Sequence, residues 1–342
     1  MGVVCRGLLL DVCYSQSMLI FILRRLAQSA FVLLAMSALV FAGIYAIGNP
    51  IDILINPQAD QAEIARATAA LGLDQPLPVQ YWHFLTGAFG GELGRSFASN
   101  VPAMDLILQR MPATVELALT AMVIALVLGL PLGLWAGLHP DAVSSKAIMA
   151  GSIVGFSLPT FWVGLMLIMV FSVWLGWLPP TGRGDTVNLF GLELSVFTWD
   201  GLRHIFMPAL NLALFKLALL IRLTRAGTRE AMVMDYVRFA RAKGVPENQV
   251  VRVHVLKNIL IPIVTVVGLE FGSVLAFAIV TETIFAWPGM GKLLIDSINV
   301  LDRPVIVAYL LVIVVVFVCI NLIVDLLYSV LDPRVRLSGA RA

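Results

Sequence analysis

The sequence predicts an all-α membrane protein with six transmembrane helices and both termini on the cytoplasmic side. Its composition is the first observation: 60% of the 342 residues are hydrophobic, 13% are charged, and the mean hydropathy is +0.94. Soluble domains carry about 25% charged residues, so a chain this apolar must have the lipid bilayer as its solvent. The second observation is a set of six apolar runs, and the third is an uneven distribution of Lys and Arg between the segments that join them.

Six apolar runs approach the length that a membrane crossing needs, which is about 20 residues for a straight helix. They lie at 26–47, 113–138, 147–175, 207–221, 261–285 and 305–330. The fourth run is short and contains Lys216, so its bounds are the least well marked. In the second run Gly129, Gly133 and Gly137 recur every four residues, a spacing that predicts close packing against another helix.

The charges between the runs orient the bundle. With both termini inside, fifteen Lys and Arg residues fall on the cytoplasmic side and seven on the outer side, the bias that the positive-inside rule requires. This orientation defines an outer loop at 49–111 and a cytoplasmic loop at 222–260. Within the outer loop, residues 61–71 predict a short helix that ends at Gly72.

The N-terminus divides into two parts. Residues 1–17 contain one cation and no small-residue cleavage site, so they do not read as a signal peptide. Met18 opens an apolar stretch that holds the paired Arg24 and Arg25. We therefore interpret Met18 as the natural initiator, 1–17 as a misassigned gene start or a disordered tail, and 18–342 as the membrane domain.

Several classes of function lack their sequence signatures. A net charge of +2 argues against binding nucleic acid by bulk electrostatics. Cys5, Cys13 and Cys319 are too scattered for a disulfide framework or a metal site. The nearest imitation of a phosphate-binding loop, at 288–293, has one residue between its glycines and Leu293 where a hydroxyl is needed. We therefore predict no catalytic residue, no metal and no cofactor in this chain.

Acidic residues inside the apolar runs are candidates for function, because a charge in lipid is costly. Glu116, Glu270 and Asp325 meet this description, and Asn321 lies one helical turn from Asp325. They could line a pathway as a proton relay or a substrate contact, or they could lock the bundle through hydrogen bonds between helices. We favour the second reading over a relay, because a proton relay usually needs several acids along one path.

A basic, polar segment interrupts the apolar runs between Arg222 and Lys257, with eight cations and three acids. Its residues from Asp235 to Lys243 predict a short helix, with Asp235 as N-cap and Gly244 as a left-handed C-cap. A second short helix is expected after Val245-Pro246, and Pro262 is expected to open the fifth span.

The first of these short helices carries a stripe that we expect to be exposed: Tyr236, Phe239, Ala240 and Lys243. A helix this short is unstable alone and would gain from docking into a groove on another protein. A basic loop on anionic lipid headgroups would explain the charge equally well. It would not explain two aromatic side chains bracketed by a glycine and a proline.

This segment, read as DYVRFARAKG, VHVLKN and IP, resembles the cytoplasmic loop of permease subunits of bacterial ATP-binding-cassette importers. The similarity is to the branch that serves dipeptides, oligopeptides and nickel, and most of all to the dipeptide permease subunits. It extends from Met18 to Leu337 through further stretches in order: GELGRSF (91–97), RMPATVELAL (110–119), SLPTFWVGL (157–165), GWLPPTG (176–182), MPALNLAL (207–214), RLTRA (222–226), TETIFAWPGMGKLL (281–294) and NLIVDLLYSVLDPRVR (321–336). Departures from the family pattern are Phe239 for a threonine, Ile-Gly-Asn-Pro at 47–50 and Leu-Asp-Arg-Pro at 301–304.

The resemblance implies a permease domain with the type I importer fold in the cytoplasmic (inner) membrane of a bacterium. It implies four kinds of partner besides lipid: a second homologous permease, two cytoplasmic ATPase subunits that hold the ATP and magnesium, and an extracytoplasmic solute-binding protein. It also implies that a short helix couples the permease to one ATPase. The coupling residues carried over are Asp235, Tyr236, Arg238, Phe239, Ala240, Arg241, Ala242, Lys243 and Gly244.

Two readings from other classes remain open at the level of sequence. One is a secondary transporter driven by the proton gradient, in which Asp325 would act in the relay. The other is a membrane scaffold that transports nothing. The solute is open as well: peptides fit best, and nickel chelates or glutathione are alternatives.

Overall fold

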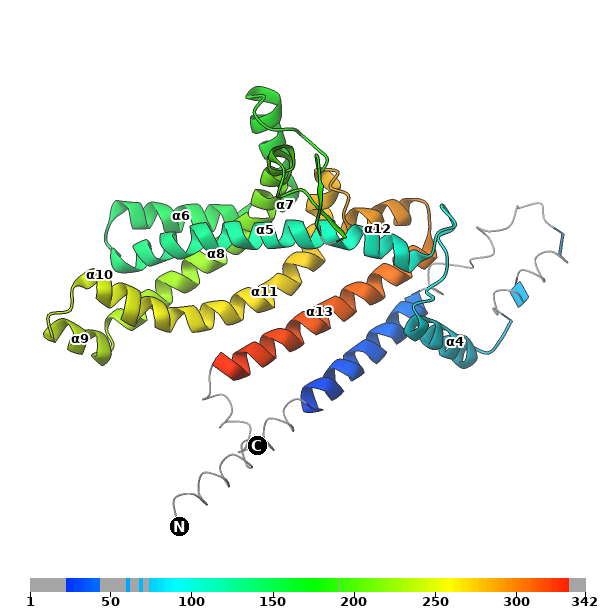
Figure 1. The fold of residues 1–342 in the computed structure, drawn as a ribbon, viewed down its shortest axis with the longest axis horizontal. Helices are drawn as coiled ribbons and strands as arrows, with labels where there is room; N and C mark the ends of the chain where they lie inside the picture. Colours follow the sequence, from blue (N-terminus) through cyan, green and yellow to red (C-terminus); the bar gives the residue numbers. More distant parts are fainter. Residues whose placement is uncertain (1–22, 44–59, 62–67, 70–73, 190, 332–342) are drawn as a thin grey trace, which may run out of the picture. The chain divides into compact units, whose positions relative to one another are not determined.

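A computed structural model describes residues 23–43, 60–61, 68–69, 74–189 and 191–331, with side chains described as far as Asp325. The described chain is almost entirely helical (Figure 1). It divides into two compact units, one formed by 1–109 with 296–342 and the other by 110–295. The tail at 1–17 lies outside the described residues, as does most of the short helix expected at 61–71.

The first unit contains the helix Leu23–Gly43, α4 (Leu77–Gly90), the first residues of α5 (Ala103–Leu138), the last residues of α12 (Met290–Asn299), and α13 (Arg303–Leu331). Polar contacts join its helices. Arg25 forms an ion pair with Asp325 of α13 at 3.0 Å, and the hydroxyls of Ser37 and Tyr81 lie 2.8 Å apart.

Hydrogen bonds connect the segment before α5 to the residue that precedes α13. The hydroxyl of Ser96 and the backbone N–H of Phe97 donate to the carboxylate of Asp302, the latter at 3.0 Å. A Cβ on Gly94 would lie 3.4 Å from the Cβ of Pro304, so the two segments lie close together. Asp302 is buried, and its hydrogen bonds compensate the cost of burying a carboxylate.

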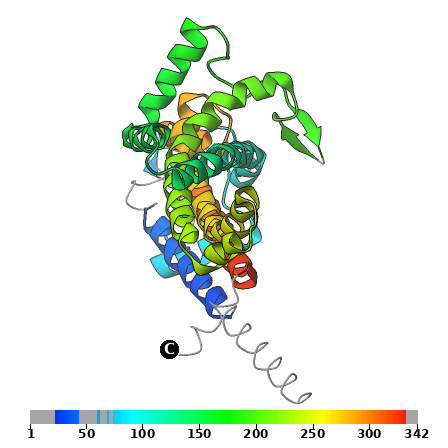
Figure 2. The same cartoon turned by 90° about the vertical axis from the view of Figure 1, so that its left-hand side faces the viewer.

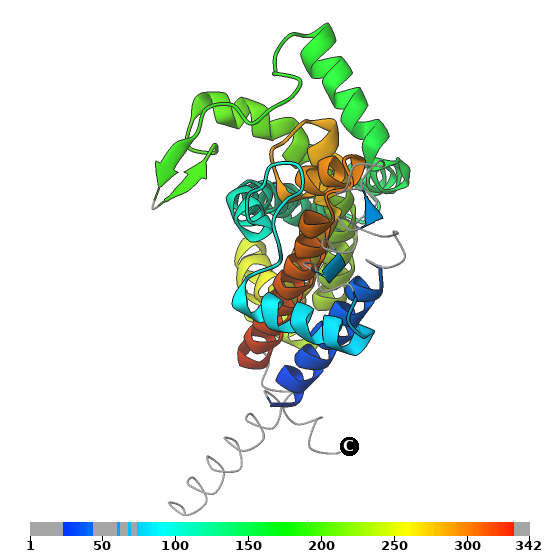
Figure 3. The same cartoon turned by 90° about the vertical axis from the view of Figure 1, so that its right-hand side faces the viewer.

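The second unit contains the rest of α5 and of α12 together with α6 (Val143–Ser157), α7 (Thr160–Leu167), η1 (Ile168–Trp174), β1 (Val187–Leu189), β2 (Leu192–Leu194), α8 (Trp199–Met232), α9 (Asp235–Ala242), α10 (Glu247–Gln249), η2 (Val250–Leu256) and α11 (Lys257–Ile284). Helix α8 packs against α6, α7 and α11. The strands form an antiparallel hairpin in which Leu189 pairs with Leu192. The two strands lie to the side of the helices of this unit (Figures 2 and 3).

The glycine stripe on α5 packs against α8, as its spacing predicted. A Cβ on Gly133 would lie 2.6 Å from the Cβ of Thr224, and a Cβ on Gly137 would lie 2.6 Å from that of Thr228. Real Cβ atoms do not approach so closely, so only glycine lets the two helix backbones pack at this distance. Thr224 and Thr228 are both fully buried at this contact.

Replacing Gly133 by valine is therefore expected to separate α5 from α8. Overpacking a close contact costs about 1–3 kcal/mol or more, so we expect a lower yield of folded protein and a lower melting temperature in detergent. Gly151→Val in α6 is the matched control, since no heavy atom lies within 4 Å of a Cβ there. An equal loss in both variants would mean that helix propensity, and not the contact, is responsible.

Among the described residues, five helices are long and apolar enough to cross a membrane, and the sixth predicted span is a helix pair bent by 106°. The transmembrane helix expected over 147–175 is therefore not one continuous helix. Leu158 takes an extended ψ of 136° before Pro159, because the proline ring clashes with a helical conformation of the residue before it.

Other predicted bounds also need correction, because apolar runs mark only the lipid-facing part of a helix. Helix α5 starts at Ala103 and not at 113. Helix α8 extends over Trp199–Met232, well beyond 207–221; its N-cap Thr198 accepts from the backbone N–H of Gly201 at 2.8 Å. The last helix agrees with its prediction within two residues.

In the segment 222–260, which the sequence predicts to be a cytoplasmic loop, the two flanking long helices extend further than expected. Helix α8 continues to Met232, and a continuous helical segment resumes at Glu247. This segment passes through the π-helical η2 into α11, so no separate second short helix forms. Pro262 lies inside α11 and not at its start.

Candidate functional site: helix α9 and the buried carboxylates

Helix α9 has one buried face and one exposed face. Val237 and Ala240 are buried where α9 packs against η2 and the end of α8. On the other side Tyr236 is exposed and Phe239 is 63% exposed. The ammonium of Lys243 lies 4.5 Å from the centre of the Phe239 ring, a cation–π contact. The exposed face therefore presents two aromatic rings and a cation.

The predicted stripe is correct for Tyr236, Phe239 and Lys243 and wrong for Ala240. Ala240 is only 5% exposed. A neighbouring helix covers it, which helix periodicity alone does not predict. The remaining members of the predicted coupling set, Asp235, Arg238, Arg241, Ala242 and Gly244, are exposed.

The two ends of α9 are fixed differently from each other. Asp235 is the first helical residue and not the N-cap; that position is Met234, which makes no side-chain cap. At the other end Gly244 takes φ +77°, as predicted. The N–H of Val245 bonds to Ala240 O at 3.2 Å and that of Gly244 to Arg241 O at 2.9 Å. This pair of bonds is the Schellman arrangement that ends helices at a glycine.

A bidentate ion pair connects α9 to the following helix. The guanidinium of Arg241 donates to both carboxylate oxygens of Glu247, at 2.5 and 3.1 Å. This hydrogen bonding raises the pKa of Arg241. The ion pair bridges the turn around Gly244 and joins the end of α9 to α10.

A groove of about 560 Å³ lies directly before α9. It is lined by the end of α5 and the turn after it, including Leu138 and Pro140, and by the last two turns of α8 and the residue that follows them, including Arg229, Glu230 and Val233.

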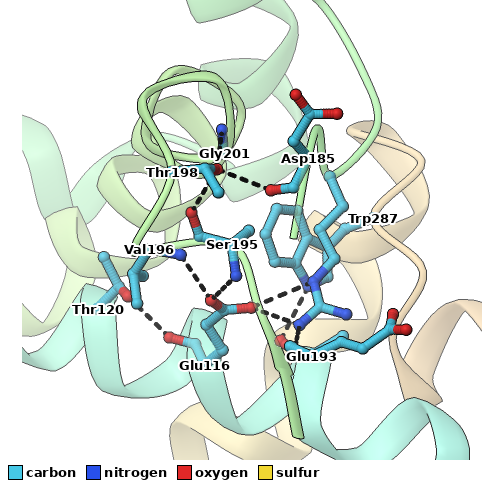
Figure 4. Close-up of polar contacts among 11 residues, drawn as sticks. Glu116, Thr120, Asp185, Glu193, Ser195, Val196, Thr198, Gly201 and Trp287 are labelled. Carbon is cyan, nitrogen blue, oxygen red and sulfur yellow. Dashed lines mark hydrogen bonds and ion pairs between the residues drawn. The ribbon is translucent and has the colours of Figure 1, made fainter. Parts of the chain in front are cut away.

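At the other end of α8, Glu116 binds the loop that carries the β-hairpin. Its carboxylate accepts from the guanidinium of Arg183 at 2.6 and 3.1 Å and from the backbone N–H groups of Ser195 and Val196 at 2.5 and 2.9 Å. Figure 4 shows the Glu116 carboxylate directed at these two nitrogens, beside the Trp287 ring. Four donors thus satisfy a carboxylate that is almost completely buried.

Glu282 is a second buried carboxylate of this unit, with no exposed surface. It accepts from the Thr114 hydroxyl at 2.6 Å and from the backbone N–H of Lys292, in the first turn of α12, at 2.9 Å. The Thr114 oxygen in turn accepts from the N–H of Met290 at 2.8 Å. A Cβ on Gly289 would overlap the Glu282 carboxyl group. Glu282, in the last turn of α11, therefore serves as the N-terminal cap of α12 across the intervening turn.

The turn between α11 and α12 is anchored by Trp287. The indole is fully buried and its N–H donates to Ala113 O of α5 at 2.9 Å. The preceding residue, Ala286, takes φ +47°, a conformation that costs a non-glycine residue roughly 1–2 kcal/mol. The hydrogen bonds and burial around it hold the turn in this conformation.

The other acids singled out from the sequence have separate partners. Glu270 pairs with Lys216 of α8, and Asp325 pairs with Arg25. Asn321 is partly exposed on α13. Within the described chain no hydrogen bond joins any two of Glu116, Glu270, Asn321 and Asp325, and no group of three His, Cys, Asp or Glu residues could hold a metal ion.

Sequence reasoning missed Glu282, Arg183 and the partnership of Lys216. Glu282 meets the criterion that selected Glu270, since it too is an acid within the run 261–285. Arg183 carries no such signal: its segment WLPPTGRGD is typical of a turn. Its partner lies 67 residues away in the chain.

Comparison with solved structures gives the fold. Two crystal forms of the MetNI methionine ABC transporter in inward-facing conformations match with TM-scores of 0.54 and 0.51, at 16% and 15% sequence identity. Each match covers 68% of this chain and 98% of that chain. At this identity the likeness concerns the arrangement of helices only.

Sequence relatives are closer. The chain is 38% identical to the dipeptide transport system permease protein of Escherichia coli strain K12, over 93% of this chain and 99% of the relative. It is 40% identical to the di/tripeptide transport system permease protein of Pseudomonas aeruginosa and 39% identical to a glutathione transport system permease protein of Escherichia coli, each over 93% of this chain and 99% of the relative.

Two family models cover most of the sequence. Residues 129–337 match the binding-protein-dependent transport system inner membrane component, and residues 18–118 match the N-terminal part of the same kind of component. The chain belongs to the family of binding-protein-dependent transport system inner membrane components.

Proposed function

We propose that this chain is the membrane permease subunit of an ATP-binding-cassette importer for dipeptides or oligopeptides. Family membership and the names of its relatives support this assignment. A glutathione permease is similar to a comparable extent, so glutathione and nickel chelates are the alternative cargoes. The chain itself is proposed to bind no nucleotide and no metal, and ATP hydrolysis is assigned to separate subunits.

The structure of helix α9 is the observation that supports a role in coupling the permease to an ATPase. It offers an exposed Tyr236 and Phe239 on a helix whose other face is buried and whose end is fixed by Gly244. A partner protein with a complementary cleft could bind α9 and move it as a rigid body. We propose that this permease pairs with a homologous one and that each permease inserts its α9 into one of two cytoplasmic ATPases. ATP binding by the ATPases would then shift the spans between inward-facing and outward-facing states.

The proposed topology has six crossings and both termini on the α9 side. If the bent pair of α6 with α7 and η1 makes one crossing, the candidate spans number six. An even number of crossings returns the chain to the side on which it started. The side of α9 holds Arg222, Arg225 and Arg229 at the end of α8, which favours the cytoplasm. The hairpin end would then face the solute-binding protein.

The test is peptide uptake by the reconstituted importer. The chain is purified with the second permease, the ATPases and the solute-binding protein of the same organism, and placed in vesicles. We expect uptake of a labelled dipeptide that requires ATP inside and persists in the presence of an uncoupler. Uptake that survives ATP removal and collapses with the uncoupler would instead establish a proton-driven carrier. Absence of uptake of any solute that the binding protein retains would favour a scaffold.

Gly244→Val is expected to abolish uptake while leaving the spans inserted. Valine strongly disfavours a positive φ, and no heavy atom lies near a Cβ at this position, so the effect acts through the backbone alone. Gly244→Asn is the matched control, because asparagine tolerates this conformation. Co-purification of the ATPase and its stimulation by loaded binding protein are the readouts; equal activity of the two variants would rule out the role of the cap.

Arg241→Glu is expected to weaken coupling by opening the same turn. The variant places two carboxylates where Arg241 and Glu247 now form a bidentate pair. We expect at least a tenfold loss of uptake, with substantial recovery in the double variant Arg241→Glu/Glu247→Arg. Failure of the exchanged pair to recover while α9 still binds the ATPase would show that Arg241 acts through the partner and not through Glu247.

A further inference from the structure

Lys216 of α8 and Glu270 of α11 form an ion pair on the surface of the second unit. The ammonium of Lys216 donates to Glu270 Oε2 and, at 2.7 Å, to the hydroxyl of Ser273. The Ser273 hydroxyl lies 2.9 Å from the same carboxylate oxygen. The Lys216 side chain remains 14% exposed and that of Glu270 remains 30% exposed. The three groups form a connected polar cluster that the described residues of this unit leave partly exposed.

This cluster lies at the midpoint of both helices. Lys216 is midway between Trp199 and Met232, and Glu270 is midway between Lys257 and Ile284. Helix α11 rises about 42 Å at 1.5 Å per residue, against a hydrocarbon thickness of about 30 Å. The centre of such a helix lies deep within the bilayer.

Lipid is a poor cover for this surface. An ionised side chain exposed to hydrocarbon is costly, and intramembrane charges almost always face the bundle interior or a water-filled cavity. The partially exposed side of Lys216 and Glu270 must therefore face protein or water. This orients the second unit, because it identifies one lateral face of α8 and α11 as turned away from lipid.

The cluster also has unused hydrogen-bonding capacity. Among the described residues no donor reaches Glu270 Oε1, and two of the three protons of the Lys216 ammonium are used. Beside Lys216, the rings of Phe215 and Phe156 stack with centroids 4.4 Å apart, and both rings are exposed. One acceptor, one donor and an exposed aromatic surface thus lie together.

We propose that this cluster is a contact site for peptide on the translocation pathway, an inference that rests on the function proposed above. Glu270 Oε1 accepts a hydrogen bond from the terminal ammonium or an amide N–H of the peptide, and Lys216 donates to its carboxylate or a carbonyl. The Phe156 and Phe215 rings contact apolar side chains. The contact is weak, because Lys216 and Glu270 largely neutralise each other, and a transport pathway needs a site that releases its cargo.

Water access is tested first, by thiol labelling in the complete importer. Cys5, Cys13 and Cys319 are first replaced by alanine. One protein then carries Ser273→Cys and a second protein carries Val127→Cys. Val127 is an exposed apolar residue of α5, two positions from Gly129 and so on the side away from α8. A charged, membrane-impermeant maleimide is expected to label Ser273→Cys and not Val127→Cys, with slower labelling when alanyl-alanine and the binding protein are present.

The contact itself is tested with the double variant Lys216→Met/Glu270→Gln. A neutral pair of similar shape preserves packing and leaves neither charge without a partner. We expect dipeptide uptake to fall about tenfold, the size of one lost hydrogen bond to a charged group, while the ATPase is still stimulated by loaded binding protein. Lys216→Met alone is expected to be worse, because it leaves Glu270 unpaired.

The outcomes separate this inference from the proposed function. Absence of ATP-dependent peptide uptake by the unmodified importer contradicts the function, whatever the labelling shows. Normal uptake with an unlabelled Ser273→Cys in every nucleotide state places the cluster in a protein interface and overturns the inference alone. Normal uptake by a folded Lys216→Met/Glu270→Gln importer overturns it as well, even if the site is open to water.

Discussion

Glu282→Ala is expected to destabilise the second unit by about 2–6 kcal/mol, because it leaves two hydrogen-bond donors without their acceptor at about 1–3 kcal/mol each. The Thr114 hydroxyl and the Lys292 N–H lose their acceptor. The loss also removes the cap of α12, at a turn where Ala286 already has a positive φ. Thermal melting of the detergent-solubilised chain, followed by size-exclusion chromatography, measures the effect.

Two further variants define the cause. Glu193→Ala removes an exposed carboxylate of β2 and is expected to melt as the unmodified chain does. Glu282→Gln keeps one acceptor and adds a donor that faces other donors, so its melting temperature should fall between those of the alanine variant and the unmodified chain. A Glu282→Ala protein that melts normally would show that water replaces the carboxylate at this turn.

Arg183→Ala is expected to release the hairpin loop from α5. The variant leaves the nearly buried Glu116 without its charged partner, and breaking a buried ion pair by removing one member costs about 3–5 kcal/mol. Two backbone bonds from Ser195 and Val196 remain, so the helices should still assemble. We expect faster protease cleavage within residues 184–194, measured by mass spectrometry of the fragments.

The double variant Glu116→Gln/Arg183→Met distinguishes the cost of an unpaired buried charge from the loss of the contact between the two side chains. Because neither charge is then buried alone, we expect cleavage much closer to the unmodified rate than in Arg183→Ala. Arg203→Ala is the control for losing an arginine, since among the described residues the Arg203 side chain makes one hydrogen bond, to the Trp177 carbonyl. Equal cleavage of the Arg203→Ala and Arg183→Ala variants would contradict a special role of the Glu116 pair.

The contacts of Glu116 and Glu282 also show how sequence motifs that are far apart in the chain are connected in the fold. RMPATVELAL provides Thr114 and Glu116, and TETIFAWPGMGKLL provides Glu282 and Trp287. The sequence presents them as separate motifs about 170 residues apart. In the folded unit they form one structure, in which α5 receives the Trp287 indole and, through Thr114, the cap of α12.

The sequence by itself determined the features that depend on local physics. Apolar runs marked the spans because lipid exposure acts on each helix separately, and the four-residue spacing of glycines marked the face of α5 that meets α8. Gly244 marked the end of α9 because a positive φ is a local property of the backbone. The family also followed from ordered motifs, and it is confirmed by the matches over 129–337 and 18–118.

Only the tertiary structure decided which charges meet and which surfaces remain open. Glu116 pairs with Arg183, Glu282 with Thr114 and Asp325 with Arg25, at separations of 67, 168 and 300 residues along the chain. No periodicity links positions so far apart. The burial of Ala240 depends on η2 packing over α9. The bend at Pro159 was visible in the sequence as a proline, but its angle of 106° depends on how the helices on either side pack, because a proline removes a helical bond without fixing the direction that follows.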